Sequence, residues 1–226
     1  MSQRLLGALV VSLAVLVSAC SGSGGDNASP STGDWAPGSS ATSESGPKYT
    51  RFADFPGKAL GTVEPGAPVG IQVKPVDVVW APELAGKSAR PGEHYLAVYL
   101  AVTGELADRG VQGARLDFLE AKITIGRGTC NELENPGLCY VKASPATGLE
   151  KEVPDNTWRT KLWIATSYAR TDIAAGDTVI GVVGFSVADD ADIQGDMELC
   201  GPSKTERYND RKFPCVPIPK PEGTRN

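Results

Sequence analysis

Eight consecutive residues, Tyr95 to Val102, place apolar or small side chains on both faces of an extended chain. The even positions from Leu96 to Val102 are leucine or valine, and the odd positions from Tyr95 to Ala101 are tyrosine or alanine. A strand that is apolar on both faces is typical of the centre of a sheet that is covered on both sides. The sequence therefore predicts a layered β structure built around this segment.

A second segment alternates with one change of phase. Val69, Ile71 and Val73 occupy odd positions, and the apolar residues then continue on even positions from Val76 to Trp80. The phase changes next to a proline, which cannot donate a hydrogen bond to a strand ladder. We therefore predict a β-bulge here, at the edge of a sheet.

Further stretches with the same period complete the predicted fold. The chain contains 26 glycines and 17 prolines, which supply turns and disfavour a helical bundle. We predict an all-β domain, an antiparallel β-sandwich of about seven strands. Its remaining strands are Leu116 to Ile125, a short one from Cys139 to Lys142, Trp158 to Thr166, Val179 to Val187 and Ile193 to Leu199, and a helical turn or two is allowed between Leu106 and Leu119.

The first residues resemble a bacterial lipoprotein signal. Arg4 precedes an apolar run from Leu5 to Val17, which as a helix covers about 20 Å and is too short for the roughly 30 Å membrane core. The run ends in Val17-Ser18-Ala19-Cys20, small residues before a cysteine, which resembles a lipobox. The resemblance implies that residues 1–19 are cleaved and that Cys20 is lipidated, anchoring the protein on the outer face of the bacterial plasma membrane. An ordinary secretory signal with an incidental cysteine is the alternative.

Residues 20–47 follow as a tether. Serine, glycine, proline and threonine dominate this segment, and it has too few apolar side chains to offset the entropy of folding. We expect it to be disordered and to connect the lipidated cysteine with a folded domain at residues 48–226.

Four cysteines lie in the exported domain: Cys130, Cys139, Cys200 and Cys215. An even number in an exported chain indicates disulfides, and four cysteines allow three pairings. We favour the local pairs, Cys130–Cys139 and Cys200–Cys215, because each closes a polar loop rich in turn residues. A four-thiolate metal site is disfavoured because no Cys-x-x-Cys pair is present, so no metal is predicted.

Two stretches are similar to a family of immunoglobulin-like bacterial lipoprotein domains of unknown function, related to secreted immunoprotective antigens. The first is the Gly-Asp turn at Gly176-Asp177 followed by the glycine-bearing strand Thr178 to Val187. The second is the Pro-Gly turn and valine-bearing strand of Arg90 to Val98. Val102-Thr103-Gly104-Glu105 departs from the Asn-Gly-type turn of that family. The resemblance implies an exported immunoglobulin-like sandwich of binding type, without known catalytic residues.

Composition limits the chemistry that the chain can perform. The net charge of −5 argues against a nucleic-acid partner, and the single histidine, His94, has no second histidine with which to form a metal or catalytic site. His94 lies in phase with Leu96, so we predict a structural role for it. No Gly-x-Ser-x-Gly nucleophile motif is present, so we predict no catalytic residue and no cofactor.

Three further features have two interpretations each. The acidic stretch Asp189 to Asp196 is either a solvated turn, which we favour, or a Ca²⁺ loop without the usual ligand spacing. Trp158 and Trp163 fall on opposite faces of a predicted strand, so one belongs to the core and the other is a candidate for a binding surface. The proline-rich tail Phe213 to Pro221 should be extended and cover a sheet edge rather than recruit a partner.

Two functional hypotheses follow. The first is a membrane-anchored, non-catalytic envelope module that binds a protein, peptide or glycan partner, with ligand-binding residues unknown. The alternative is an envelope hydrolase using two carboxylates, although no spacing in the sequence selects a pair. A concave site that gathers polar groups favours an enzyme, and a flat or convex patch favours a binding module.

Overall fold

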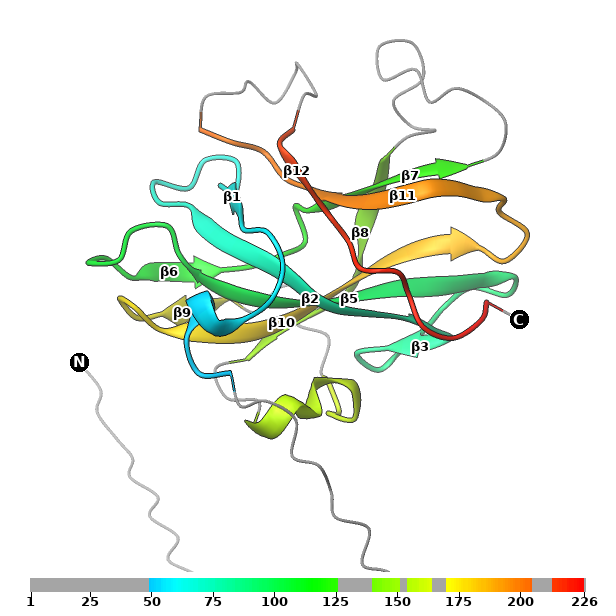
Figure 1. Ribbon diagram of the computed structural model, residues 1–226, viewed down its shortest axis with the longest axis horizontal. Helices are drawn as coiled ribbons and strands as arrows, with labels where there is room; N and C mark the ends of the chain where they lie inside the picture. Colours follow the sequence, from blue (N-terminus) through cyan, green and yellow to red (C-terminus); the bar gives the residue numbers. More distant parts are fainter. Residues whose placement is uncertain (1–48, 126–139, 151–153, 164–169, 205–212, 226) are drawn as a thin grey trace, which may run out of the picture. The chain divides into compact units, whose positions relative to one another are not determined.

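The computed structural model describes residues 49–125, 140–150, 154–163, 170–204 and 213–225 (Figure 1). Cys20, Cys130 and Cys139 lie outside these residues. The protein is all-β, with 48% strand and 4% helix, which confirms the all-β part of the predicted fold class. None of the described helices is long and apolar enough to span a membrane.

The described elements follow one another as short strands with two 3₁₀ helices. The helices are η1 (Phe52–Asp54) and η3 (Pro154–Arg159). The strands are β1 (Leu60–Thr62), β2 (Ile71–Ala81), β3 (Glu83–Leu84), β4 (Lys87–Ser88), β5 (Glu93–Gly104), β6 (Val111–Ala114), β7 (Glu120–Ile125), β8 (Tyr140–Glu150), β9 (Thr171–Ile173), β10 (Thr178–Ala188), β11 (Ile193–Cys200) and β12 (Cys215–Pro217).

Eight of these strands form one antiparallel sheet in the order β1-β2-β5-β10-β8-β7-β11-β12, and β3-β4 and β6-β9 form two small sheets. The central strand is β5, between β2 and β10, and every residue from Tyr95 to Val102 is buried, as its pattern predicts. The phase change in β2 is also confirmed, because its pairing with β5 shifts between Pro75 and Asp77. Pro75 lies beyond the residues of β2 that pair with β1.

One long strand divides the large sheet into two parts. The first residues of β8, Tyr140–Lys142, pair with β7, whereas Ala143–Glu150 pair with β10. Figure 1 shows β2, β5 and β10 together, with β8 leading from them to β7 and β11. The sheet therefore folds back around a common interior.

The two edges of this sheet approach each other, so that it is nearly barrel-like. Both Thr62 Oγ1 and the amide of Val63, at the end of β1, donate to the carbonyl of Pro202, which follows β11. A Cβ on Gly201 would collide with the Thr62 side chain, so only glycine fits at this contact. Beyond β12 the tail crosses to β2, where Glu222 forms a parallel bridge with Val79.

The side chains of β5 separate two apolar clusters. Its even positions from Leu96 to Val102 belong to the inner core, which the large sheet encloses, together with Ile71, Val111, Ile123, Val183, Phe185, Leu199, Val216 and others. Its odd positions from Tyr95 to Ala101 belong to the outer core, with Phe55, Leu84, Trp158, Trp163, Ile180 and Val182. Because η1, η3 and the β3-β4 hairpin supply residues to the outer core, both faces of β5 are covered.

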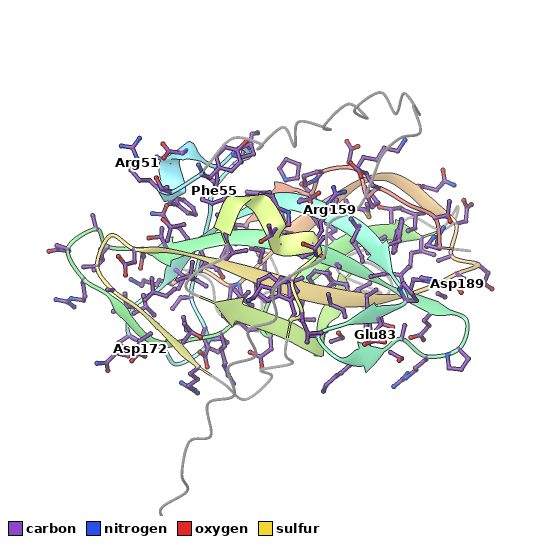
Figure 2. The ribbon with its side chains drawn as sticks, turned by 90° about the horizontal axis from the view of Figure 1, so that it is seen from below. Arg51, Phe55, Glu83, Arg159, Asp172 and Asp189 are labelled. Carbon is purple, nitrogen blue, oxygen red and sulfur yellow. A yellow bond between two sulfur atoms is a disulfide. The ribbon has the colours of Figure 1, made fainter. Side chains whose placement is uncertain are left out.

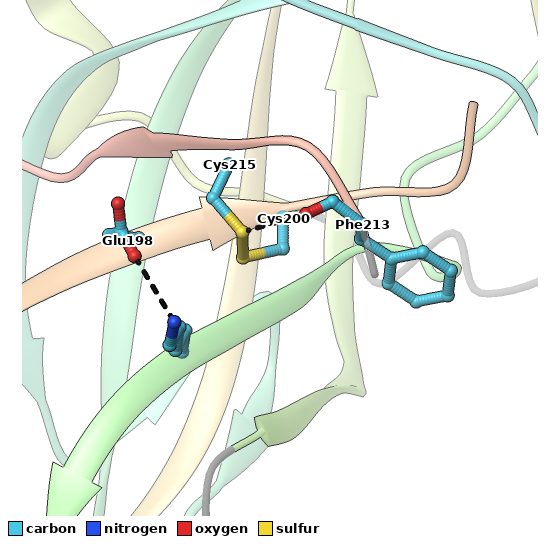
Figure 3. The surroundings of a disulfide bond; sticks show 5 residues. Glu198, Cys200, Phe213 and Cys215 are labelled. Atoms are coloured by element: carbon cyan, nitrogen blue, oxygen red, sulfur yellow. Dashed lines mark hydrogen bonds and ion pairs between the residues drawn. A yellow bond between two sulfur atoms is a disulfide. The ribbon is translucent and has the colours of Figure 1, made fainter. Parts of the chain in front are cut away.

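The tail is fastened as the sequence predicts. Cys200 and Cys215 form a disulfide between the paired ends of β11 and β12, and the Cys215 side chain lies 3.3 Å from the Phe213 carbonyl oxygen (Figure 3). Val216 and Ile218 are buried in the inner core. The tail thus covers the free edge of β11, partly as a strand rather than only as an extended segment.

The structure differs from the predicted elements in three places. Trp158 belongs to η3 and Trp163 to an irregular segment, so the described part of Trp158 to Thr166 is no strand. Both tryptophans are buried, so neither is the expected exposed aromatic. No helical turn is present between Leu106 and Leu119, where β6 and turns lie instead, and the strand predicted from Leu116 begins only at Glu120. Glycines at 110 and 113 favour the bulged strand over a helix.

Candidate functional site

A cleft of about 840 Å³ lies at one end of the large sheet. Its walls come from the β1-β2 loop, the β5-β6 loop, β6 with the segment after it, and both ends of β9. Three arginines line it, Arg109, Arg115 and Arg170, together with the carboxylates of Glu64 and Asp172. We call this region the arginine cleft.

A one-residue bulge in β6 places one of these arginines. Val111 pairs with Ile173 and Ala114 with Thr171, so β6 has one residue more than β9 between these pairs. Gly113 takes the extra position with φ of 64°, and its amide donates to Asp172 Oδ1 at 2.8 Å. A Cβ on Gly113 would lie 2.9 Å from Cδ of Arg170. The glycine therefore allows the Arg170 side chain to lie against the backbone of β6.

The opposite wall, the β1-β2 loop, is held at both ends. Ala67 N donates to Glu64 O at 2.9 Å and closes a turn, and Gly70 N donates to Glu105 Oε2 at 3.1 Å. Lys204 donates to the same carboxylate oxygen at 2.5 Å. This hydrogen bond from Lys204 is the main reason that the pKa of Glu105 lies below its usual range.

The charges inside the cleft are unequal. Glu64 Oε1 lies 2.5 Å from one nitrogen of Arg115 and 3.8 Å from one of Arg170, so one carboxylate serves two guanidinium groups. Only 14% of the Glu64 side chain is exposed, against 57% for Arg170. Arg109 is exposed, and no described residue forms an ion pair with its guanidinium group.

Arg115 also has an unsatisfied donor. Its Nε is buried without a hydrogen-bond partner in the described structure, and so is the nearby Oδ1 of Asp117, 3.4 Å away. The two atoms thus form an ion pair without hydrogen-bond geometry. Buried polar groups are nearly always hydrogen-bonded, so the Nε of Arg115 can still donate to a further acceptor, such as water or a group of a ligand.

Beneath the charged groups the cleft has an apolar floor. Ile71, Val111 and Ile173 line it and belong to the inner core. Val69 and Phe118 line it as well and are only partly buried. Because the floor is continuous with the core, it is a fixed surface rather than a loop contact.

His94 lies at the other end of the sheet. Its Nδ1 is 2.6 Å from Asp189 Oδ1, so the histidine has an acidic partner that the sequence alone did not reveal. Figure 2 shows Asp172, beside the arginine cleft, and Asp189 at opposite ends. The pair lies outside the cleft and agrees with the structural role predicted for His94.

The other acidic residues of this stretch do not converge. Asp192 Oδ1 accepts a hydrogen bond from the side chain of Gln194, and no group of three metal-binding side chains occurs among the described residues. Within those residues the favoured interpretation, a turn beside β11, fits the observed geometry.

Trp158 belongs to a second charged cluster, which we call the η3 clamp. Trp158 Nε1 donates to Asp77 Oδ2 at 2.8 Å, Arg159 donates to both oxygens of Asp77, and Arg159 also lies 2.7 Å from Glu222. Burial by itself raises the pKa of Asp77, but the hydrogen bonds from Arg159 and Trp158 outweigh it and hold the pKa below its ordinary value of 3.8. The clamp fixes η3 and the tail on β2.

A smaller hollow of about 360 Å³ lies beside the clamp. Tyr99 and Trp163 line it, and Leu162, 82% exposed, borders it. Trp163 Nε1 already donates to the carbonyl of Trp158 at 2.8 Å, so the ring offers no free donor to a ligand. This hollow is a weaker candidate than the arginine cleft.

Comparisons with models of protein families, with curated proteins and with solved structures gave no match. The site therefore has to be judged on its own geometry. Of the predicted site residues, Cys200 and Cys215 are joined, whereas Cys20, Cys130 and Cys139 lie outside the described residues.

The arginines of the cleft were not among the predicted site residues. Arg109 and Arg115 flank the glycine pair at 110 and 113, and Arg170 precedes β9. Glycines between two arginines were a usable signal of a basic bulge, but nothing local indicated that Glu64 and Arg170 would join them.

Proposed function

We propose that this protein is a non-catalytic binding module of the bacterial cell envelope and that the arginine cleft binds an anionic group of its ligand. The observation that carries the proposal is the supply of guanidinium groups: Arg115 and Arg170 share Glu64, and no described residue forms an ion pair with Arg109. Guanidinium groups bind carboxylate, sulfate and phosphate through paired hydrogen bonds.

The contrast with the whole chain strengthens this argument. The net charge of the protein is −5, yet three arginines line the cleft, and two of them, Arg109 and Arg170, extend exposed side chains. Exposed cationic groups on an acidic protein attract anions to that place, whereas the rest of the surface repels them. A protein, peptide or glycan partner would enter the cleft through an acidic group.

The envelope location rests on the N-terminal sequence. Cys20 in its lipobox-like context would carry the lipid anchor, and the Ser/Gly/Pro-rich residues after it would hold the domain away from the membrane. We further propose that the large sheet is an immunoglobulin-like sandwich of the lipoprotein family named above. The division of its pairing along β8 supports two sheet halves around one interior.

The hydrolase hypothesis also gains one observation, since the best site is concave and holds Glu64 and Asp172. Both carboxylates, however, already accept hydrogen bonds or ion pairs from the chain, Glu64 from two arginines and Asp172 from the amide of Gly113. Because these carboxylates are engaged by groups of the chain itself, we favour binding over hydrolysis.

The binding proposal is tested by titrating the full chain with inorganic phosphate and following amide NMR shifts. Arg170→Gln removes an exposed guanidinium from the cleft and should raise the Kd about tenfold, as expected for one charge-assisted pair. Arg90→Ala is the matched control, because Arg90 is exposed in the turn before β5, at the other end of that strand from Arg109. Equal Kd values for all three proteins, or no binding, would contradict the proposal. Turnover of a glycoside by the wild-type chain would favour the hydrolase.

The anchor is tested separately in cells. Cys20→Ser should block lipidation and leave an unprocessed precursor, as judged by metabolic labelling with a fatty acid and by mass. A normally processed, membrane-held Cys20→Ser protein would show that the anchor lies elsewhere.

A further inference from the structure

The lining of the arginine cleft separates into two chemically different sets. The charged side chains Arg109, Arg115 and Arg170 come from the segments flanking β6 and β9. The apolar side chains, from Val69 of the β1-β2 loop to Phe118 after β6, pack against the inner core. A single site thus offers guanidinium groups and hydrocarbon surface next to each other.

A small hydrophilic anion would use only half of this site. Inorganic phosphate can reach Arg115 and Arg170, but it leaves the surface of Val69 and Phe118 in water. A neutral hydrocarbon would cover that surface but leave Arg109, which forms no ion pair with a described residue, and the exposed Arg170 without an anionic ligand. A ligand that satisfies both sets carries an acidic group and an apolar body.

We infer that the ligand of the arginine cleft is an anionic amphiphile: a single alkyl or acyl chain that ends in a phosphate or carboxylate group. This inference rests on the proposed function, because it takes the arginines as the anion site. The acidic head lies at Arg115 and Arg170, and the chain lies along Val69 and Phe118 over the floor of Ile71, Val111 and Ile173. The cleft volume of about 840 Å³ is within the range of roughly 300–1,000 Å³ for small-molecule sites.

Glu64 interacts differently with the two arginines that would bind the acidic head. Glu64 is mostly buried and holds Arg115 at 2.5 Å, so that guanidinium is oriented before the ligand arrives. Arg170 is more exposed, and its nearest guanidinium nitrogen lies 3.8 Å from the same oxygen, farther away than that of Arg115. The other donors of Arg170 are therefore left for the ligand. One arginine is thus fixed and the other is available to close on the head.

The experiment is a calorimetric titration of the full chain with inorganic phosphate, butyl phosphate, hexyl phosphate and octyl phosphate, each below its micelle concentration, and with octanol as the neutral probe. Burying a CH₂ group tightens binding about fourfold. The Kd should therefore fall from inorganic phosphate to octyl phosphate by about tenfold or more for each two carbons, until the floor is covered. Octanol should bind much more weakly than octyl phosphate.

Three variants assign the two halves. Arg170→Gln should raise the Kd of octyl phosphate about tenfold. Val69→Thr keeps the shape of the side chain but replaces a methyl group by a hydroxyl, so the ratio between the affinities of octyl phosphate and inorganic phosphate should fall severalfold. Arg90→Ala should behave as wild type with every probe.

The outcomes separate the two proposals. Equal Kd values for phosphates of every chain length, together with weaker binding in Arg170→Gln, would contradict the amphiphile proposal. The anion-site proposal would remain supported. Binding of a tetraglutamate peptide in preference to octyl phosphate would do the same. If octanol binds with the same Kd as octyl phosphate, and Arg170→Gln changes neither Kd, both proposals are contradicted.

A second arm distinguishes the source of the amphiphile. Phosphatidylcholine vesicles that contain lysophosphatidylglycerol, an anionic lipid with a single acyl chain, are incubated with the protein and then removed by centrifugation. Lipid that remains with the wild-type chain and is lost from Arg170→Gln indicates a ligand taken from a bilayer. Octyl phosphate binding without such lipid transfer indicates a ligand taken from solution, and either result supports the amphiphile.

Discussion

Two arginine clusters of this protein differ in how their cations are paired. In the η3 clamp, one guanidinium, that of Arg159, meets two carboxylates, Asp77 and Glu222. In the arginine cleft, Arg115 meets two carboxylates, Glu64 and Asp117, but Arg170 only shares Glu64 and Arg109 forms no ion pair with a described residue. The clamp satisfies its single cation within the chain, whereas the cleft does not satisfy all three of its cations.

This difference separates a structural cluster from a binding site. The clamp joins three segments, β2, η3 and the tail, and its donors are used for packing. The cleft leaves buried Nε of Arg115 without a hydrogen bond and Arg109 without a described ion pair. The two clusters therefore differ in whether each guanidinium group has a partner within the chain, and not in the presence of arginine.

The largest expected effect comes from releasing the tail, which carries Glu222 of the clamp and nothing of the cleft. Cys215→Ala opens a disulfide with a sequence separation of 15, worth about 3 kcal/mol, and should lower Tm by about 6–12 °C. Val216 and Ile218, buried in the inner core, would lose their tether as well. Calorimetry at one pH measures the shift.

Cys139→Ala is the comparison variant, because its predicted partner, Cys130, closes a shorter loop outside the described residues. It should lower Tm less. An equal or larger shift for Cys139→Ala would mean that the tail contributes little to the stability of the core.

The next effect concerns the clamp itself. Asp77→Asn keeps the shape but removes the charge that faces Arg159, and should lower the free energy of unfolding by about 1–3 kcal/mol, since Arg159 is partly exposed to screening solvent. Denaturant unfolding measures it, and the phosphate affinity of the cleft should not change. A parallel loss of phosphate binding would show that the two clusters are coupled.

Acid should reveal the same carboxylate. The pKa of Asp77 lies below 3.8 in the folded protein, so the ionised form favours the folded state, and this contribution is present above that pH. It is lost as the pH falls from about 5 through 3.8 toward the lower pKa of the folded state. Stability of the wild-type chain, followed by thermal unfolding between pH 7 and 3, should therefore decline more steeply at the acid end than that of Asp77→Asn. Parallel curves would assign the acid sensitivity to other groups.

The smallest expected effect is a substitution in the cleft that tightens ligand binding. Glu64→Gln removes the internal competitor for Arg115 and Arg170, so the Kd of inorganic phosphate should fall about threefold to tenfold. Glu222→Gln, the corresponding change in the clamp, should leave phosphate binding as it is. Weaker binding in Glu64→Gln, measured by the same NMR titration, would mean that Glu64 orients Arg115 more than it competes with the ligand.

Several features could be predicted because their cause is local. The stretch Tyr95 to Val102 has apolar or small residues at even and at odd positions, which predicts a strand with two apolar faces. In β5 both faces are buried, one in each core. The proline next to the phase change required a bulge, and the bulge lies there. Trp158 was assigned to the wrong element because its neighbours alternate over too few residues to distinguish a strand from a 3₁₀ turn.

The sequence by itself determined the all-β class, the central strand, and the Cys200–Cys215 bridge that fastens an apolar tail. These follow from period, composition and loop length, which are properties of short stretches. The tertiary structure alone decided which charges meet. Asp77 finds Arg159 across 82 positions, and Glu64 finds Arg115 and Arg170 only when β1, β6 and β9 reach the same end of the sheet. Side-chain charges carry no period that records their partners, so closing the sheet, rather than the order of residues, creates one satisfied cluster and one open site.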